Sequence, residues 1–260
     1  MEKNLVSIIM PCFNSEKFIE ESIISVINQS YEDWELIICD DSSSDKTYEL
    51  AEKYAYAHDR IILIKNTHDK GAPGARNSCL DNARGRYIAF LDSDDLWTAN
   101  KLLVQINFMK NNNYSFTYSY INIINEKGNF ITTYKFPDYV GLKLMSFGSF
   151  IPCCSVIYDT HTLGKVYQPN IKKRNDYALW LKILAKEQLN YAYCLKSSTA
   201  SYRKNNYGLA SNKLENIKYF LEVRKKYGES NVLKAYFELI IYLAFMVLKF
   251  KVTRIYNFLV

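Results

Sequence analysis

Glycine and proline are scarce in this sequence, which has 9 glycines and 5 prolines among 260 residues. Long flexible linkers and Gly- or Pro-rich repeats are therefore excluded. The six cysteines form no Cys-x-x-Cys pair and the three histidines are scattered, a pattern that does not favour a zinc site. No basic segment followed by an apolar one opens the chain, so we expect no signal peptide, and free thiols in the cytosol.

Apolar runs of the ~20 residues that a membrane-spanning helix needs are also missing. The run Leu239–Leu248 is uncharged but too short, and Lys249, Lys251 and Arg254 follow it among further apolar residues. A basic segment beside an apolar one is typical of a helix lying on an anionic membrane surface. We therefore expect 211–260 to be a C-terminal helical segment, peripheral on the inner face of the cytoplasmic membrane. A helix that packs in the core or in a dimer is the alternative.

The composition favours neither disorder nor nucleic-acid binding. Apolar residues make up 48% and charged residues 23% of the chain, which is ordinary for a globular protein with a large core. The net charge of +6 is compatible with phosphate-bearing ligands or an anionic membrane. The basic residues form no long stripe through the chain, so we expect no nucleic-acid partner.

Short apolar runs alternate with helical patterns over the first hundred residues. The strands are expected at Leu5–Met10, Trp34–Cys39, Ile61–Ile64 and Tyr87–Leu91. Helices are expected at Glu16–Asn28 with Ser15 as its N-cap, in the segment that ends near Tyr56, and at Ala75–Ala83. This order predicts an α/β fold with a mostly parallel sheet and helices on both faces. In the second half, a hairpin is expected around Asn125–Gly128, and helices at Asp176–Ala185 and Asn212–Lys226.

Polar clusters follow three of the predicted strands: Pro11–Asn14, Asp40–Asp41 and Asp92–Asp95. Ligands of such sheets bind beyond the carboxyl ends of the strands, so these clusters predict a site at one sheet edge. Three carboxylates within Asp92–Asp95 repel one another, and a divalent cation that shares its shell with substrate phosphates relieves this. A solvated turn is the alternative for this string alone. Arg76, after a Gly-Ala-Pro-Gly loop, could reach a diphosphate or form a surface ion pair.

These blocks resemble the opening of the family 2 inverting glycosyltransferases. They occur in the order Val6–Asn14, Ser25–Ser30, Asp40–Thr47, Ala75–Asn77 and Gly85–Asp95. The resemblance implies a GT-A nucleotide-sugar-binding fold over residues 1–210, plus C-terminal helices. Residues 1–100 would bind a nucleotide-diphosphate-sugar donor, and 101–210 the acceptor.

The resemblance also implies roles for single residues on the donor side. The nucleotide-sugar-binding residues would be Pro11, Phe13, Asp41, Arg76, Asp92 and Ser93. Of these, Phe13 would stack on the base and Asp41 would hydrogen-bond to it. Asp94 would bind Mn²⁺ or Mg²⁺, with Asp95 close behind it as a second metal residue.

Asp176 is the candidate catalytic base, in the block Arg174–Lys182 that resembles the family's acceptor-side motif. An inverting transfer needs a base opposite the leaving group, to take the proton of the acceptor hydroxyl. The leaving diphosphate needs a cation, which belongs at the other carboxylate cluster. Many relatives have Glu before this Asp, whereas Asn175 stands here, so the prediction rests on Asp176. A helix N-cap is the alternative role for this residue.

Acceptor binding is expected at Lys173, Arg174, Trp180 and Arg203. Lys173 and Arg174, with Lys172, could bind the diphosphate of a lipid-linked acceptor, or form a solvated face. Trp180 could stack on a sugar or lie in the core, and Arg203 belongs to a further block that resembles the family.

The predicted function is the non-processive, metal-dependent transfer of a hexose, with inversion, from UDP-glucose or UDP-galactose to a polyprenyl-diphosphate-linked glycan. The resemblance to bacterial enzymes places this reaction in surface polysaccharide synthesis, of O-antigen, capsule or teichuronic acid. The Gln-x-x-Arg-Trp motif of processive synthases is missing. A sugar nucleotidyltransferase would want a glycine-rich phosphate loop near the N-terminus, which is also missing. A non-catalytic nucleotide-sugar-binding protein or membrane adaptor is the remaining alternative.

Overall fold

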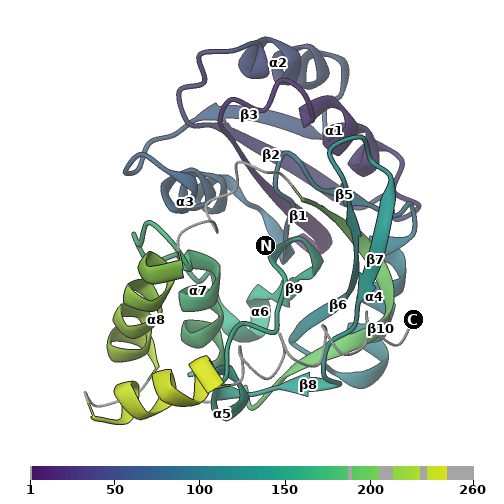
Figure 1. Ribbon diagram of the computed structural model, residues 1–260. Coiled ribbons are helices and arrows are strands. Elements are labelled where there is room, and N and C mark those ends of the chain that lie inside the picture. Colours follow the sequence, from purple (N-terminus) through teal and green to yellow (C-terminus); the bar gives the residue numbers. More distant parts are fainter. Residues whose placement is uncertain (1, 187–188, 205–212, 229–232, 245–260) are drawn as a thin grey trace.

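The computed structural model describes residues 2–186, 189–204, 213–228 and 233–244 (Figure 1). Four parallel strands form one half of the central sheet, in the spatial order β3-β2-β1-β4. Their bounds are β1 (Glu2–Cys12), β2 (Trp34–Asp40), β3 (Ile61–Lys65) and β4 (Gly85–Phe90). Every residue of β2 is buried, as expected for an apolar strand covered on both faces.

The sheet continues from β4 in the order β9-β6-β10-β5, and β7 and β8 pair with β6 and β10. The bounds are β5 (Leu96–Trp97), β6 (Phe116–Ile124), β7 (Phe130–Tyr134), β8 (Tyr139–Val140), β9 (Ile157–Asp159) and β10 (Ala192–Arg203). β6 and β10 run parallel, whereas β9 and β5 are antiparallel to their neighbours. The predicted hairpin is confirmed: it joins β6 to β7, and Gly128 adopts the positive φ of 79° that suits glycine in a turn.

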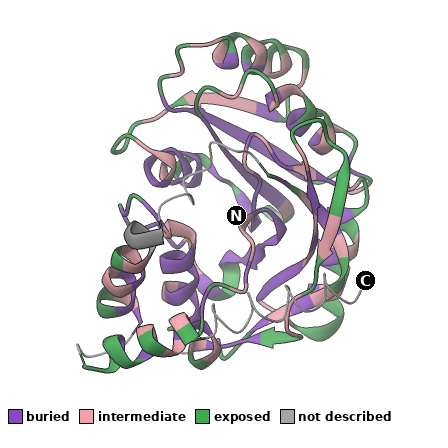
Figure 2. Cartoon of the chain, viewed as in Figure 1, coloured by how far each residue is buried: buried purple, intermediate pink, exposed green. Residues whose placement is uncertain are grey.

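Helices cover both faces of the sheet, which confirms the predicted α/β architecture. Their bounds are α1 (Ile19–Ile27), α2 (Thr47–Ala57), α3 (Ala72–Asn82), α4 (Lys101–Asn112), α5 (Leu142–Met145), α6 (Thr160–Leu163), α7 (Asn175–Leu184) and α8 (Lys213–Tyr227). Successive strand residues point to opposite faces, so β1 contributes to two cores. Ile8 and Met10 lie in the core that includes residues of α1, α2 and α4, and Ile9 lies in the core that includes residues of α3 and α7. Figure 2 shows these buried strands between the helices.

The C-terminal helices pack beside α7. Phe220 of α8 stacks between Tyr177 of α7 and Tyr242, a residue of the helical segment 233–244. A buried ion pair between Arg224 and Glu238 joins α8 to that segment. Within the described residues, no helix is long and apolar enough to cross a membrane. The boundary predicted at residue 210 and the basic residues that follow the apolar run lie outside the described residues.

Ser15 is not the N-cap of α1, so that prediction is wrong. The helix begins at Ile19, with Phe18 at the N-cap and no side-chain cap bond. The Ser15 hydroxyl instead forms a hydrogen bond of 2.8 Å with the Ser93 hydroxyl. Ser15 therefore joins the start of the helix to the acidic loop, which a local capping rule could not anticipate.

Candidate active site

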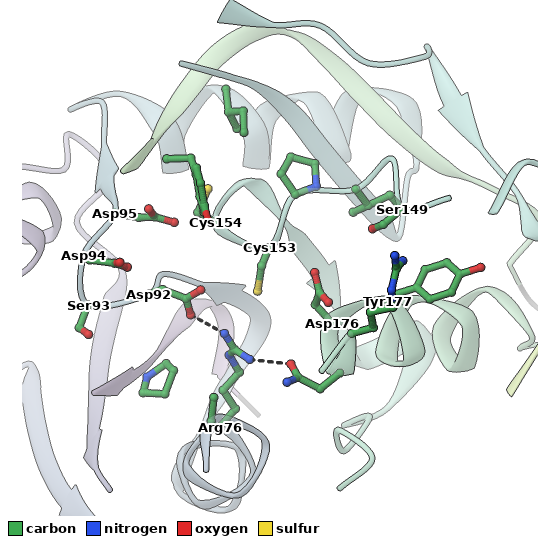
Figure 3. A pocket seen from close by; sticks show the side chains of 18 of the residues that line it. Arg76, Asp92, Ser93, Asp94, Asp95, Ser149, Cys153, Cys154, Asp176 and Tyr177 are labelled. Atoms are coloured by element: carbon green, nitrogen blue, oxygen red, sulfur yellow. Dashed lines mark hydrogen bonds and ion pairs between the residues drawn. The ribbon is translucent and has the colours of Figure 1, made fainter. Parts of the chain in front are cut away.

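The three polar strand ends meet at one edge of the sheet, as predicted. Cys12 pairs with Asp40 and Ile9 with Phe90, so the residues after β1, β2 and β4 come together. They line a cavity of about 1160 Å³, which also includes Asp176 on the first turn of α7 (Figure 3). A cavity of this size can hold a nucleotide sugar and part of a second substrate.

Pro11, Phe13 and Asp41 line the part of the cavity expected to hold the base. Phe13 is half exposed, so its ring offers a face for stacking. The Asp41 carboxylate accepts hydrogen bonds of 2.7 Å from the side chain of Asn66 and from the backbone N–H of Gly71. These bonds fix the loop after β3 against the end of β2. Each carboxylate oxygen can accept a second hydrogen bond, so Asp41 can still accept one from a nucleotide base, as predicted.

Arg76 connects the two sides of the cavity. Its guanidinium donates to the carboxylate of Asp92 and, over 3.1 Å, to the side-chain oxygen of Asn175, the residue before Asp176 (Figure 3). Burial lowers the pKa of Arg76, but the Asp92 carboxylate outweighs that effect and raises the pKa above its ordinary value, so the side chain stays charged. The Nε of Arg76 is buried without a hydrogen-bond partner in the part of the chain described. A buried cationic donor of this kind suits a phosphate oxygen.

Asp94 is the candidate metal ligand of the acidic loop 92–95. Asp92 is committed to its ion pair with Arg76, and Asp95 is buried. Burial raises the pKa of Asp95 well above its ordinary value, and repulsion from Asp94 and Asp92 adds to this, which a nearby cation would relieve. Among the described residues, no three potential metal-binding side chains converge. An ion such as Mg²⁺ or Mn²⁺ commonly takes one or two carboxylates together with substrate phosphates and water, and the carboxylates of this loop fit such an ion.

Arg203 anchors the acidic loop, so its prediction as an acceptor-binding residue is wrong. Its backbone N–H donates to the Asp95 carboxylate over 2.9 Å, and its Nε donates to the carbonyl of Asp94 over 2.9 Å. The side chain is completely buried. The reason is the alternation along β10: Tyr202 lines the cavity, so the neighbouring Arg203 points to the other face of the sheet.

Asp176 lies across the cavity from the acidic loop. Burial raises its pKa above the ordinary value of an aspartate, although the N–H of Tyr177 and the charge of Arg76 counteract this. A carboxylate with a raised pKa is a better proton acceptor, which suits the predicted general base. The N-cap of α7 is Arg174, with no side-chain cap bond, so a capping role does not explain Asp176.

The three cations before Asp176 are differently placed. Lys172, Lys173 and Arg174 all line the cavity. The guanidinium of Arg174, however, donates to the Tyr242 hydroxyl over 2.6 Å and lies against the rings of Tyr242 and Phe220. Arg174 thus links the base-bearing helix to the C-terminal helices. The predicted diphosphate contact rests mainly on the exposed Lys172, because Lys173 is buried.

Trp180 is a core residue, so its prediction as a sugar-stacking side chain is wrong. It is fully buried and packs edge-on against Phe90, with 5.6 Å between the ring centroids. The cause is that its helix position faces the sheet. Its Nε1 donates to the carbonyl of Ile151 over 3.1 Å, which holds the loop carrying Cys153. That loop separates Asp92 from Asp176 (Figure 3), and no charge or motif in the sequence marked it as part of the site.

A second group of site residues was missed because it lies on strands with no motif. The concave sheet face contributes Ile121, Ile123, Ile131, Tyr134 and Tyr202 to the cavity lining. The predicted hairpin was the available signal, but hairpin formation does not specify which face points into a cavity.

The fold is that of the GT-A-type glycosyltransferases, as solved structures confirm. Residues 1–349 of S. aureus TarS in complex with UDP-GlcNAc match with a TM-score of 0.70 and 21% identity, covering 93% of this chain and 72% of that one. The Pyrobaculum calidifontis mannosyltransferase PcManGT, in complex with GDP-Man and Mn²⁺, matches with a TM-score of 0.66 and 15% identity, covering 95% of this chain and 75% of that one. At these identities, the likeness shows the fold.

The chain belongs to glycosyl transferase family 2, whose family model matches residues 7–166. It is 40% identical to the Escherichia coli UDP-Glc:alpha-D-GlcNAc-diphosphoundecaprenol beta-1,3-glucosyltransferase WfgD, over 91% of this chain and 92% of that protein. It is 34% identical to the putative teichuronic acid biosynthesis glycosyltransferase TuaG of Bacillus subtilis, over 90% of this chain and 92% of that protein. The resemblance seen in the sequence motifs is thereby confirmed.

Proposed function

We propose that this protein transfers glucose from UDP-glucose, with inversion, to the sugar of a polyprenyl-diphosphate-linked acceptor in bacterial surface polysaccharide synthesis. The E. coli relative WfgD, a UDP-Glc:alpha-D-GlcNAc-diphosphoundecaprenol beta-1,3-glucosyltransferase, supports both the donor and the lipid-linked acceptor. UDP-galactose is the second donor to test. One sugar is added per cycle, because the motif of processive synthases is missing from the sequence.

The observation that carries this proposal is the opposition of two kinds of carboxylate across one cavity. The acidic loop 92–95 lies at the strand ends, and Asp176 lies on the other side, with Arg76 bonded toward both. An inverting displacement needs this division, because the acceptor hydroxyl must attack from the side opposite the leaving diphosphate. A protein that only binds a nucleotide sugar has no need of a base at Asp176.

In this mechanism each side has a defined task. Asp176 accepts the proton of the acceptor hydroxyl as its oxygen attacks the anomeric carbon. Asp94, together with the donor diphosphate, would hold Mn²⁺ or Mg²⁺, which would supply positive charge to stabilise the leaving nucleoside diphosphate. Arg76 offers a permanent second positive charge and keeps Asp92 and Asn175 in place.

Peripheral contact with the inner face of the cytoplasmic membrane completes the proposal. On the helical segment 233–244, the exposed apolar residues follow helical spacing and form one stripe: Leu233, Tyr236, Phe237 and Ile240. Lys225 of α8 approaches the ring of Tyr236 at this edge. An exposed apolar stripe flanked by cations suits an anionic lipid surface. Co-sedimentation with anionic vesicles should fall for Phe237→Ser and stay unchanged for Tyr56→Ser, which changes an exposed ring on α2.

The transfer reaction is tested with purified protein, Mn²⁺, a panel of UDP-, GDP- and dTDP-sugars and a synthetic GlcNAc-diphospho-lipid. We expect a lipid product from UDP-glucose that disappears with EDTA. Asp94→Asn and Asp176→Asn should each lower the rate of its formation about 100-fold or more, whereas Asp138→Asn, in an exposed ion pair, should not. Tight nucleotide binding without transfer from any donor would instead favour the non-catalytic alternative.

A further inference from the structure

The concave face formed by β6, β7 and β10 is a cavity wall that carries none of the residues assigned to the donor or to the base. Ile123 pairs with Tyr202 on one side and with Thr132 on the other, so these three side chains share a face. Ile121 and Tyr134 form the next row of the same face. All five residues line the cavity.

A β-bulge adds one more apolar side chain to this wall. Ile123 pairs with Thr132, but Ile124 pairs with Phe130, so Ile131 is an extra residue in β7. Bulges redirect side chains, and Ile131 accordingly lines the cavity beside Thr132. Phe130, on the opposite face, is 64% exposed and does not line the cavity.

The two ends of the wall differ in their surroundings. Tyr202 lies at the acidic loop, because the backbone N–H of the next residue, Arg203, donates to the Asp95 carboxylate over 2.9 Å. Ile131 and Tyr134 lie farther from that loop, across β6, and both are about half exposed. The wall therefore leads from the reaction centre to an apolar, open edge.

We infer that this wall binds the lipid-linked acceptor, with Tyr202 beneath its sugar ring and with Ile131 and Tyr134 against the first isoprene units. This inference rests on the proposed function and names the acceptor subsite for it. A sugar ring has apolar C–H faces that pack on an aromatic side chain, whereas a half-exposed isoleucine beside a tyrosine suits a hydrocarbon chain. The exposed Lys172 and Lys204, which line the same cavity, offer cations for the diphosphate between them.

The test compares two acceptors that carry the same sugar diphosphate, one on a polyprenyl chain and one on a methyl group. Binding of each is measured in the presence of UDP, and transfer is measured in parallel. Ile131→Ser with Tyr134→Ser should weaken binding of the prenyl acceptor about tenfold, and leave the methyl acceptor and the donor KM unchanged. Tyr202→Leu should weaken both acceptors, and Tyr202→Phe should restore them because the ring is kept. Phe130→Ser, on the other face of the same strand, is the matched control.

The lipid subsite would be overturned if the double variant of Ile131 and Tyr134 bound both acceptors equally weakly, or bound both as tightly as the wild type does. In either case the wild-type protein would still transfer the sugar, so the proposed function would stand. A loss in Phe130→Ser as large as in the double variant would also overturn it, because the effect would then not depend on the face. If the wild-type protein binds neither acceptor and transfers to neither, both this inference and the proposed function fail.

Discussion

Replacing Arg203 with methionine should detach the acidic loop from the rest of the fold. Its guanidinium donates to the carbonyls of Asp94 and Glu126, over 2.9 Å each, and to the carboxylate of Glu21 over 2.6 Å. Methionine keeps much of the volume but supplies no donor. Because the arginine side chain is completely buried, water cannot readily replace its bond to the Asp94 carbonyl.

The magnitude follows from what each acceptor loses. A buried carbonyl left without a donor costs about 1–3 kcal/mol, and this applies to the Asp94 carbonyl, whereas the carbonyl of the exposed Glu126 can bond to water instead. The ion pair adds at most ~1 kcal/mol, because Glu21 is 57% exposed. Relief of the cost of burying a guanidinium offsets part of the total. We therefore expect Arg203→Met to lower the free energy of unfolding by about 2 kcal/mol, and Mn²⁺-dependent UDP affinity to fall about tenfold as Asp94 shifts.

Urea unfolding and calorimetric titration of UDP with Mn²⁺ measure the two effects. Arg203→Lys should recover less than half of the stability, because one ammonium cannot reproduce the fork of the guanidinium. Lys196→Met is the matched control on β10: its ion pair with Asp138 is exposed, so the change should stay within about 0.5 kcal/mol. If Arg203→Met matched the wild type in both stability and affinity, the anchoring role would be refuted.

Three further predictions concern buried ionisable groups. Asp176→Asn should lower kcat about 10²–10⁴-fold and leave the donor KM unchanged, because only proton transfer is lost; steady-state kinetics with saturating acceptor will show this. Burial raises the pKa of Asp176 in the free enzyme, so the acid limb of the kcat/KM–pH profile should lie above the ordinary 3.8, and a limb at or below that value would contradict the assignment. Burial lowers the pKa of Lys101 from 10.5 to about 7. Between pH 7 and pH 10.5 the unfolded chain therefore binds more protons than the folded protein, so the free energy of unfolding of the wild type increases as the pH rises. For the wild type this increase amounts to about 2 kcal/mol between pH 7 and roughly pH 8.5, and Lys101→Met should lack it. Urea unfolding curves of both proteins at the two pH values measure the difference.

The donor side was predictable because its signals are local. An apolar run followed at once by Asp40 and Asp41, or by Asp92, marks the carboxyl end of a parallel strand. The rule that such ends share an edge then brings distant residues together without any knowledge of the packing. Asp176 was also predictable from a local signal, the sequence block Arg174–Lys182, and the structure places it across the cavity from the acidic loop.

The acceptor side was less predictable because its side chains are selected by strand register and helix orientation. Arg203 and Tyr202 are adjacent, and only the pairing of β10 with β6 decides which one faces the cavity. Trp180 has the residue type of a sugar platform, but its helix position faces the core. Ile131 reaches the cavity through a bulge, which depends on a one-residue shift of register that no local pattern of the strand reveals.

The most direct test of the account is the structure of the product made from UDP-α-glucose and a synthetic GlcNAc-diphospho-lipid. The purified wild-type protein would be incubated with both and Mn²⁺, and the new glycosidic bond examined by mass spectrometry and proton NMR. We expect a single hexose, added in the β configuration. An α-linked product, or a lipid left unchanged while the protein binds UDP-glucose, would contradict the account.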